Sequence, residues 1–393
     1  MSSSWPTRRL SDLVDNGEIS YGIVQPGNET PGGVPIVRVK DVRNGVVDVS
    51  DPLRVAPEIA AQYSRTTLRG GELLVSIVGT VGEAAVAPSS MAGWNVARAI
   101  AVIRPTEVSS EWIRLCLQTQ SVRNAFEAAL NTTVQATLNL ADLKRLQIPV
   151  PPRGERESIA EVLGALDDKI AANRQIARLA DGLLSGMFAR MSAAAPLGRL
   201  AEIAKVNVAT TRPKSGGHLR YLDISSVSVG SYEMPAPMSW DEAPGRARRV
   251  VRDGDTVWST VRPNRRSHAL VLDESEELIG STGLAVISPA AGRVAGVYES
   301  TRTDTFVQYL ESVAEGSAYP AVRGERFLDA PIPRLAPEVW DDFESVALPI
   351  RRRVGAAMRE NRALANARDE LLPLLMSGRI RVRDAEKVVE EVV

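Results

Sequence analysis

The stretch Gly71-Glu-Leu-Leu-Val-Ser76 returns further along the chain as Gly254-Asp-Thr-Val-Trp-Ser259. Two more segments return in the same order, namely Ala101-Val-Ile-Arg-Pro105 as Ala285-Val-Ile-Ser-Pro289 and Ile148-Pro-Val-Pro151 as Ile332-Pro-Arg-Leu335. The offset is 183 or 184 residues each time. A near-constant offset over three separate segments indicates a duplicated domain, because the repeating units of solenoids are only about 20–50 residues long.

Length and composition predict an ordinary globular protein. The 393 residues favour two to three domains, and 44% hydrophobic and 24% charged residues are typical of a soluble chain. No apolar run approaches the ~20 residues of a membrane span, and no secretory stretch opens the sequence. The one cysteine, Cys116, excludes an internal disulfide and is expected to be buried, so we expect a cytoplasmic protein. The net charge of −1 counts mildly against nucleic-acid binding, although local clusters can still supply a basic face.

Residues 1–152 predict a mixed α/β domain. Strands are expected within 35–39, 73–78 and 99–103, with an Asn-Gly turn at 44–45. A helix is expected over 111–130, capped by Ser109 or Ser110. Pro149, Pro151 and Pro152 end the domain, because proline continues neither a helix nor a strand ladder.

Residues 153–192 predict one long helix. Apolar and small residues step by 4 and 3 along a heptad seam, namely Ile159, Leu163, Leu166, Ile170, Asn173, Ala177, Ala180, Leu184, Met187 and Met191. Residues 193–335 then repeat the first domain. A second helical region follows over 336–378, with Pro349 expected at a helix start and a seam of Ile350, Val354, Ala357, Asn361, Leu364, Arg368, Leu371 and Leu375. Residues 379–393 are expected to be a charged tail.

The two seams can pair antiparallel. One register pairs residues whose numbers sum to 534. It places Asn173 opposite Asn361, Ile170 opposite Leu364, Ala177 opposite Ala357, Ala180 opposite Val354 and Leu184 opposite Ile350. A buried Asn pair would fix this register at a cost in stability. In the alternative, each helix packs separately on its own domain. Both stay open, because a heptad pattern alone does not specify which helix it packs against.

These features together resemble the specificity subunit of type I restriction–modification systems. In each half, Gly-[Glu/Asp] followed by three mostly apolar residues and Ser is similar to the family's central strand. Ile159-Ala-Glu-Val-Leu163 with Leu166-Asp-Asp-Lys-Ile170 looks like its first conserved helical region, and Glu360-Asn-Arg-Ala-Leu364 with 368–378 looks like its second. One departure is Gly154-Glu155-Arg156, where the family often has glutamine.

The resemblance implies an α+β fold with two similar mixed α/β target-recognition domains, held apart by two long antiparallel helices in a pseudo-twofold coiled coil. Each domain would bind one half of a bipartite, asymmetric site on double-stranded DNA. The helices would set the spacer and dock two methyltransferase subunits, and restriction–translocase subunits would complete the complex. S-adenosylmethionine, ATP and Mg²⁺ would be bound by those partners, with no cofactor in this chain and no membrane contact.

The chain is predicted to be non-catalytic by itself. It has no Gly-x-x-x-x-Gly-Lys-[Ser/Thr] phosphate loop and no Asn/Asp-Pro-Pro-aromatic motif of the kind adenine methyltransferases use. His218 and His268 lack partners at metal-ligand spacing, so each is expected at the surface or facing DNA. Asp167 and Asp168 occupy successive helix positions and are expected on an exposed helix edge rather than in an acid–base pair.

Candidate DNA contacts cluster in loops. In the second domain, guanidinium groups could bond phosphates or read guanine, and Asn could read adenine; the candidates are Arg262, Asn264, Arg265, Arg266, Ser317, Tyr319 and Arg323. In the first domain they are Ser76, Thr80, Lys40, Arg43, Arg98, Thr132, Thr133 and Gln135. Two plainer interpretations stay open: solvated loops with ion pairs to Asp253 and Asp255, and simple helix-end turns.

Two other classes of function remain in view. A protein-interaction scaffold with two adhesion-like domains on a helical spacer fits the balanced charge. An enzyme in its own right, either nuclease or methyltransferase, is disfavoured by the missing motifs.

Overall fold

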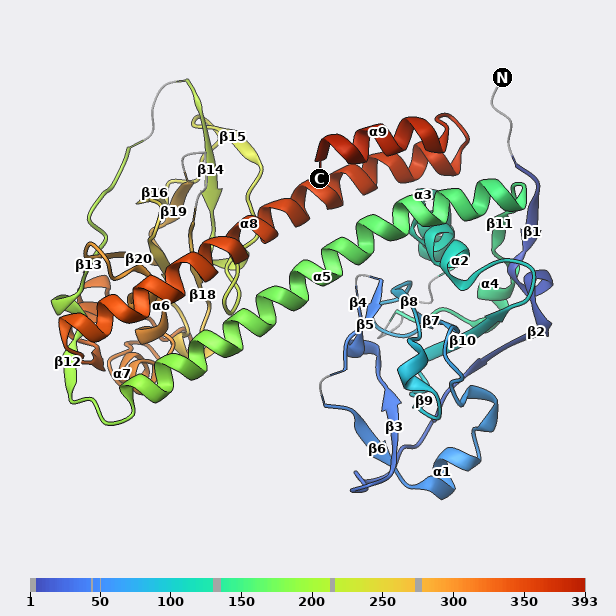
Figure 1. The fold of residues 1–393 in the computed structure, drawn as a ribbon, viewed down its shortest axis with the longest axis horizontal. Coiled ribbons are helices and arrows are strands. Elements are labelled where there is room, and N and C mark those ends of the chain that lie inside the picture. Colours follow the sequence, from blue (N-terminus) through green and yellow to red (C-terminus); the bar gives the residue numbers. More distant parts are fainter. Residues whose placement is uncertain are drawn as a thin grey trace. The chain divides into compact units, whose positions relative to one another are not determined.

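The chain folds into two compact units. The computed structural model describes residues 5–43, 45–49, 51–129, 136–212, 216–272 and 278–392. The first unit comprises Met1–Ala172 with Glu360–Val393, and the second comprises Asn173–Arg359. The boundary between the units therefore divides two long helices, α5 (Arg153–Ser192) and α8 (Pro337–Met376) (Figure 1). Each helix contributes one segment to each unit.

The first unit is built on an antiparallel sheet of order β2-β10-β7-β8, with smaller sheets β6-β3-β9, β4-β5 and β1-β11. Its strands are β1 (Thr7–Arg9), β2 (Val14–Tyr21), β3 (Val34–Val37), β4 (Val42–Arg43), β5 (Val46–Val47), β6 (Leu53–Val55), β7 (Leu73–Ser76), β8 (Ala84–Val86), β9 (Asn95–Val96), β10 (Ile100–Pro105) and β11 (Gln147–Pro149). Its helices besides α5 and α8 are α1 (Pro57–Ala61), α2 (Ser110–Gln118), α3 (Gln120–Ala129), α4 (Leu140–Arg145) and α9 (Val382–Val392).

The second unit repeats this plan. Its strands are β12 (Leu197–Arg199), β13 (Ala204–Val206), β14 (His218–Leu222), β15 (Pro237–Ser239), β16 (Ala247–Val251), β17 (Thr256–Ser259), β18 (His268–Leu270), β19 (Leu278–Ser281), β20 (Leu284–Pro289) and β21 (Pro331–Pro333), and its helices are α6 (Val294–Ser300) and α7 (Asp304–Ser312). The sheet order β13-β20-β17-β18 matches β2-β10-β7-β8. Ile100 pairs with Ser76 just as Leu284 pairs with Ser259, so the duplication extends to strand register.

The helix predicted over 111–130 is two helices. Ser109 caps α2 by accepting a hydrogen bond from the Trp112 N–H at 3.1 Å, as expected. Thr119 then takes an extended backbone (ψ 147°), and α3 begins at Gln120. The break lets α2 pack on β7, β8 and β10, and α3 follows as a separate helix (Figure 1). Val122 and Phe126 of α3 pack in the same core. Cys116 is fully buried there, as predicted.

The expectation that Pro349 begins a helix is wrong. Helix α8 begins at Pro337, where the missing N–H of proline leaves no bond unmade, and it continues through Pro349 and Pro373. Trp340, Phe343 and Ala347 bury the first turns of α8 against Leu184 and Phe188 of α5. This packing precedes Pro349 and stabilises a helix that local sequence alone would end.

The charged tail forms a helix, α9. It folds back along the end of α8 (Figure 1), and Ala385 is completely buried in the first unit's core. Ile380, Val382 and Val389 pack on the same core. Between its charged residues the tail carries apolar residues at helical spacing, and these form the buried face of α9.

The heptad seams pack together within each unit. In the first, Ile159, Leu163, Leu166 and Ile170 of α5 share a core with Leu364, Leu371 and Leu375 of α8. Asp167 pairs with Arg368 and Lys169 with Glu360, so the two segments run antiparallel. In the second, Leu184 and Ile350 share a cluster. Asn173 and Asn361 are both buried, but they belong to different units, and their pairing stays a prediction.

Candidate nucleic-acid interface

The duplicated serine anchors a turn in each unit. Ser76 ends β7 with its hydroxyl fully buried; that hydroxyl donates to the Thr80 carbonyl and accepts from the Glu83 N–H at 3.0 Å. Ser259 ends β17, donates to the Val261 carbonyl at 2.8 Å and is likewise buried. These serines recur because they shape the turn, and the buried Ser76 hydroxyl is not part of the exposed candidate surface.

Each turn lies beside the polar loop that precedes the domain's last strand. In the second unit, the Arg262 N–H donates to the Pro320 carbonyl at 2.7 Å, and Val261 bridges Ala321. In the first, the Gly79 N–H donates to the Ala136 carbonyl at 3.0 Å, and Val78 bridges Thr137. Segments some 60 residues apart in the sequence thus form one surface.

In the second unit this surface carries exposed polar side chains. Asn264 and Arg265 are exposed, as is Ser317, and Tyr319 is 69% exposed. The Arg262 guanidinium stacks on the Tyr319 ring, 4.6 Å from its centroid. Such a surface can bond phosphates and base edges.

The remaining arginines of this surface have carboxylate partners. Arg266 forms an ion pair with Asp304, the first residue of α7, and Arg323 forms one with Glu315 at 3.1 Å. In the part of the chain that the structure describes, no carboxylate pairs with Arg262 or Arg265. The expected ion pairs to Asp253 and Asp255 are therefore absent from these two residues, since Asp253 instead pairs with Arg352 of α8.

The first-unit candidates are more scattered. Thr80 is exposed in the turn, Lys40 and Arg43 are exposed near the β4–β5 hairpin, and Arg98 is exposed just before β10. The β4–β5 hairpin packs beside β7 and β8, which brings β4, the strand of Arg43, close to the sheet that carries the turn. Thr132, Thr133 and Gln135 lie outside the described residues.

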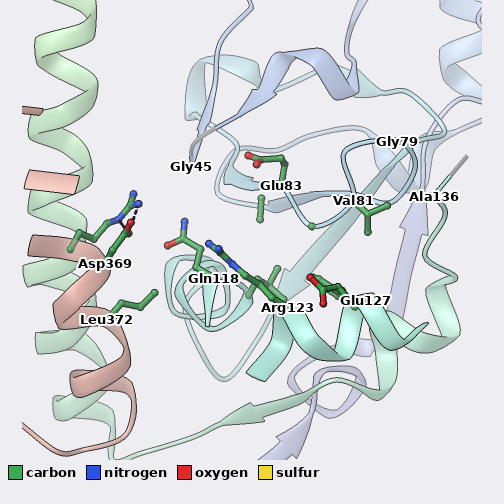
Figure 2. Close-up of a pocket in the computed structure, with 15 residues that line it drawn as sticks. Gly45, Gly79, Val81, Glu83, Gln118, Arg123, Glu127, Ala136, Asp369 and Leu372 are labelled. Atoms are coloured by element: carbon green, nitrogen blue, oxygen red, sulfur yellow. Dashed lines mark hydrogen bonds and ion pairs between the residues drawn. The ribbon is translucent and has the colours of Figure 1, made fainter. Parts of the chain in front are cut away.

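A cavity of about 500 Å³ opens beside the first turn. Figure 2 shows Arg123 and Glu127 beside the turn that carries Gly79 and Val81, with Asp369 and Leu372 of α8 across the hollow. Its lining mixes both signs of charge, since Arg123 and Arg368 meet Glu83, Glu127 and Asp369. This balance favours no anionic ligand by itself.

Buried polar and aromatic residues lie beneath the candidate surface of the second unit. His268 of β18 is 2% exposed and stacks on Trp258 at 5.1 Å, so the expectation that it faces solvent or DNA is wrong; His218 is exposed, as expected. Strand alternation turns His268 inward from the turn it follows. Burial lowers the His268 pKa to about 4, so the ring is neutral at pH 7. His268 also contacts Tyr298 of α6.

The Tyr298 ring packs against the guanidinium groups of Arg302 and Arg351, which belong to a network of ion pairs with the long helices. Arg351 of α8 pairs with Glu299 of α6 and, at 2.8 Å, with Asp181 of α5; Arg302 bonds Asp181 bidentately at 2.7 and 2.8 Å. Burial pushes the Asp181 pKa upward, but hydrogen bonds from Arg302 and Arg351 outweigh it and hold that pKa below its ordinary value. The network fixes the second domain to both helices.

The first unit has a corresponding network in which the charges are exchanged, so that the long helix supplies the carboxylate and the domain supplies the arginine. Arg114 of α2, 2% exposed, bonds Asp167 of α5 at 2.5 Å, and Arg368 of α8 bonds the same carboxylate at 2.8 Å. The expected exposed edge is therefore wrong for Asp167, although Asp168 is exposed. Positions 167 and 351 lie 184 residues apart and carry opposite charges, each matched by its own domain.

No metal centre emerges within the described ranges: no group of three or more His, Cys, Asp or Glu could hold an ion there. None of the described helices has the length and apolar character to span a bilayer.

Comparison with known proteins gives a family model and a relative that each match part of this chain. Residues 2–179 match the model of the type I restriction modification DNA specificity domain. The EcoBI type I restriction enzyme specificity subunit of Escherichia coli is 30% identical over 183 residues, which cover 44% of this chain and 38% of that protein. This match therefore spans well under half of the relative's own length.

Two further relatives match over nearly the whole chain. A putative MjaX type I restriction enzyme specificity subunit of Methanocaldococcus jannaschii is 21% identical, covering 96% of this chain and 94% of its own. The crystal structure of the type I restriction–modification system S subunit from M. genitalium aligns with a TM-score of 0.59 at 14% identity, over 94% of this chain and 96% of that one. At that identity the likeness concerns the fold.

Proposed function

Because residues 2–179 place this chain in the family of type I restriction–modification specificity subunits, we propose that it recognises a bipartite DNA site, one half with each domain. The observation that carries the proposal is the pair of matching turns. The same sheet order presents Gly79-Thr-Val-Gly82 in one unit and Arg262-Pro-Asn-Arg265 in the other. A repeated scaffold with unlike turns suits two different half-sites.

DNA would be held by phosphate contacts and read by base contacts. Exposed Arg265, Lys40, Arg43 and Arg98 suit phosphates, because cations that neutralise phosphates release condensed counterions. Asn264, Ser317, Thr80 and Arg262 suit base edges, where hydrogen-bond patterns differ between base pairs. Thr132, Thr133 and Gln135 remain candidates on the sequence alone.

The two long helices would form an antiparallel coiled coil that sets the distance between half-sites. The shared cores within each unit and the buried positions of Asn173 and Asn361 support this arrangement. Helix α8 is the second copy of helix α5 in the duplication. The antiparallel pair would therefore have pseudo-twofold symmetry and offer two equivalent faces to two copies of one partner.

Partner subunits would supply the chemistry. An apolar stripe on α5, formed by Ile176, Leu179 and Leu183, is 46–63% exposed and suits docking of a methyltransferase subunit. We assign no catalysis to this chain: methyl transfer, ATP-driven translocation and cleavage, with S-adenosylmethionine, ATP and Mg²⁺, would belong to methyltransferase and restriction subunits. A cytoplasmic location is part of the proposal.

The test is methylation by the reconstituted complex of this chain with the methyltransferase subunit of its host. Sequencing of methylated adenines in a random-sequence library should give one bipartite motif with a fixed spacer. Methylation without sequence preference would overturn the proposal. A scaffold with no role on DNA predicts that Arg262→Ala with Arg265→Ala leaves the affinity for DNA unchanged, whereas we expect that affinity to fall.

A further inference from the structure

We propose that Arg262 is a specificity-determining residue of the second domain and that it reads a guanine in that domain's half-site. The inference rests on the proposed function and deepens it. It is carried by two independent observations, the backbone conformation of the turn and the ring against which the side chain lies.

The backbone of the turn is suited to glycine but holds arginine. Gly79 and Gly82 of the first turn have φ of +82° and +94°. The matching positions of the second turn, 183 and 184 residues later, are Arg262 and Arg266, with φ of +52° and +54°. Elsewhere among the described residues, the non-glycine positions with positive φ are asparagines, which tolerate this region. Strain of this kind clusters where function requires it.

The two arginines have different roles. Arg266 pairs with Asp304, which explains its place by structure alone. Arg262 has no carboxylate partner in the described part of the chain; its N–H is fixed to the Pro320 carbonyl and its guanidinium to the face of Tyr319. An aromatic ring that is 69% exposed stabilises little protein core. The ring instead holds the planar guanidinium in one orientation at the surface.

A fixed, planar guanidinium suits guanine above other bases. Guanine presents two acceptors, O6 and N7, at the spacing of two parallel N–H donors, whereas adenine presents a donor beside N7. Immobilising a long side chain before binding reduces the entropy lost when the contact forms. Lysine is a weaker substitute, because its ammonium group lacks the rigid planar fork of donors and does not stack on the Tyr319 ring as a guanidinium does.

The experiment compares methylation motifs of reconstituted complexes containing wild-type chain, Arg262→Gly and Arg262→Lys. Glycine is the residue of the matching first turn and suits the backbone, so the thermal unfolding midpoint of the variant should not fall. We expect Arg262→Gly to lose the preference for G·C at one position of one half-site by between about 5-fold and 150-fold, with the other half-site unchanged. Arg262→Lys should weaken the same preference while retaining the charge.

Arg199→Ala, a change of an exposed arginine on β12 outside the turn and the loop, is the matched control and should leave the motif unchanged. A uniform loss of methylation across all sequences, or full preference retained by Arg262→Lys, would overturn the inference and indicate a phosphate contact. A wild-type complex with no bipartite motif would overturn the proposed function instead, so the two failures are distinguishable.

Discussion

The duplicated serine shows how one residue type can suggest two roles. From sequence, Ser76 was a candidate DNA contact because a hydroxyl follows a strand into a turn. In the fold, Ser76 and Ser259 are both buried and both bond the turn they begin. Arg262 is the opposite case: its partner Tyr319 lies 57 positions away, and only the strand-like bridge between Val261 and Ala321 brings them together.

His268 gives a prediction at the residue scale. Its folded pKa of about 4 lies below the ordinary 6.5, so the unfolded chain binds its proton more readily. The stabilising contribution is present above pH 6.5 and is lost as the pH falls toward 4. Between pH 7 and 5, wild-type protein should lose about 1–2 kcal/mol more unfolding free energy than His268→Gln.

Urea denaturation at the two pH values measures this difference. His218→Gln, which changes an exposed histidine, should behave like the wild type. Cations of Arg302 and Arg266 near His268 act in the same direction as burial, and Asp181 opposes them. Equal pH dependence in wild type and His268→Gln would show that the ring is not buried in neutral form.

At the scale of elements, the long helices are defined by what packs on them. Helix α8 passes through two prolines because buried aromatic residues hold its first turns. Asp167 and Arg351, at equivalent positions, bind groups of opposite charge from their own domains. Exchange of the two domains would place like charges together, so the networks specify which domain sits on which helix segment.

Arg351 tests this attachment. Arg351→Met would remove one of the two arginines that pair with buried Glu299 and one of the two that pair with Asp181, and we expect the unfolding free energy to fall by about 3 kcal/mol. Arg352→Ala changes the neighbouring residue, whose ion pair with Asp253 is half-exposed, and should cost less than about 1 kcal/mol. Similar losses for the two variants in chemical denaturation would contradict a buried network.

Helix α9 gives a second prediction for elements. Ala385 is completely buried where α9 meets the first core, while the next residue, Glu386, is exposed. Ala385→Asp should reduce the unfolding free energy by at least about 2 kcal/mol, because it buries a charge without a partner. Glu386→Ala should have little effect. Unchanged stability of Ala385→Asp would mean that the tail does not dock.

At the scale of the whole molecule, two compact units share two helices, and one face of α5 is left apolar. Ile176, Leu179 and Leu183 step by 3 and 4 and are exposed, although equally spaced residues on the seam are buried. Exposed apolar stripes of this kind commonly mark protein–protein contacts. The proposed docking of a methyltransferase subunit would cover this stripe.

We expect Leu179→Glu with Leu183→Glu to reduce copurification of the methyltransferase subunit by at least tenfold, since charges would replace the centre of an apolar contact. Thermal stability should hardly change, because both side chains already face solvent. Leu197→Glu alters another exposed leucine, on β12, and serves as control. Undiminished copurification would place the docking surface elsewhere.

The sequence by itself determined the duplication, the fold class, the long helix over 153–192 and the heptad seams, because each is written as a spacing of residue types along the chain. It also determined that Cys116 is buried. Tertiary structure alone decided that α8 runs unbroken through Pro349, that His268 points inward and that Asp167 is paired, since each depends on residues distant in the chain. It alone joined Arg262 to Tyr319, because the surface that they form is made by strand pairing and not by proximity in sequence.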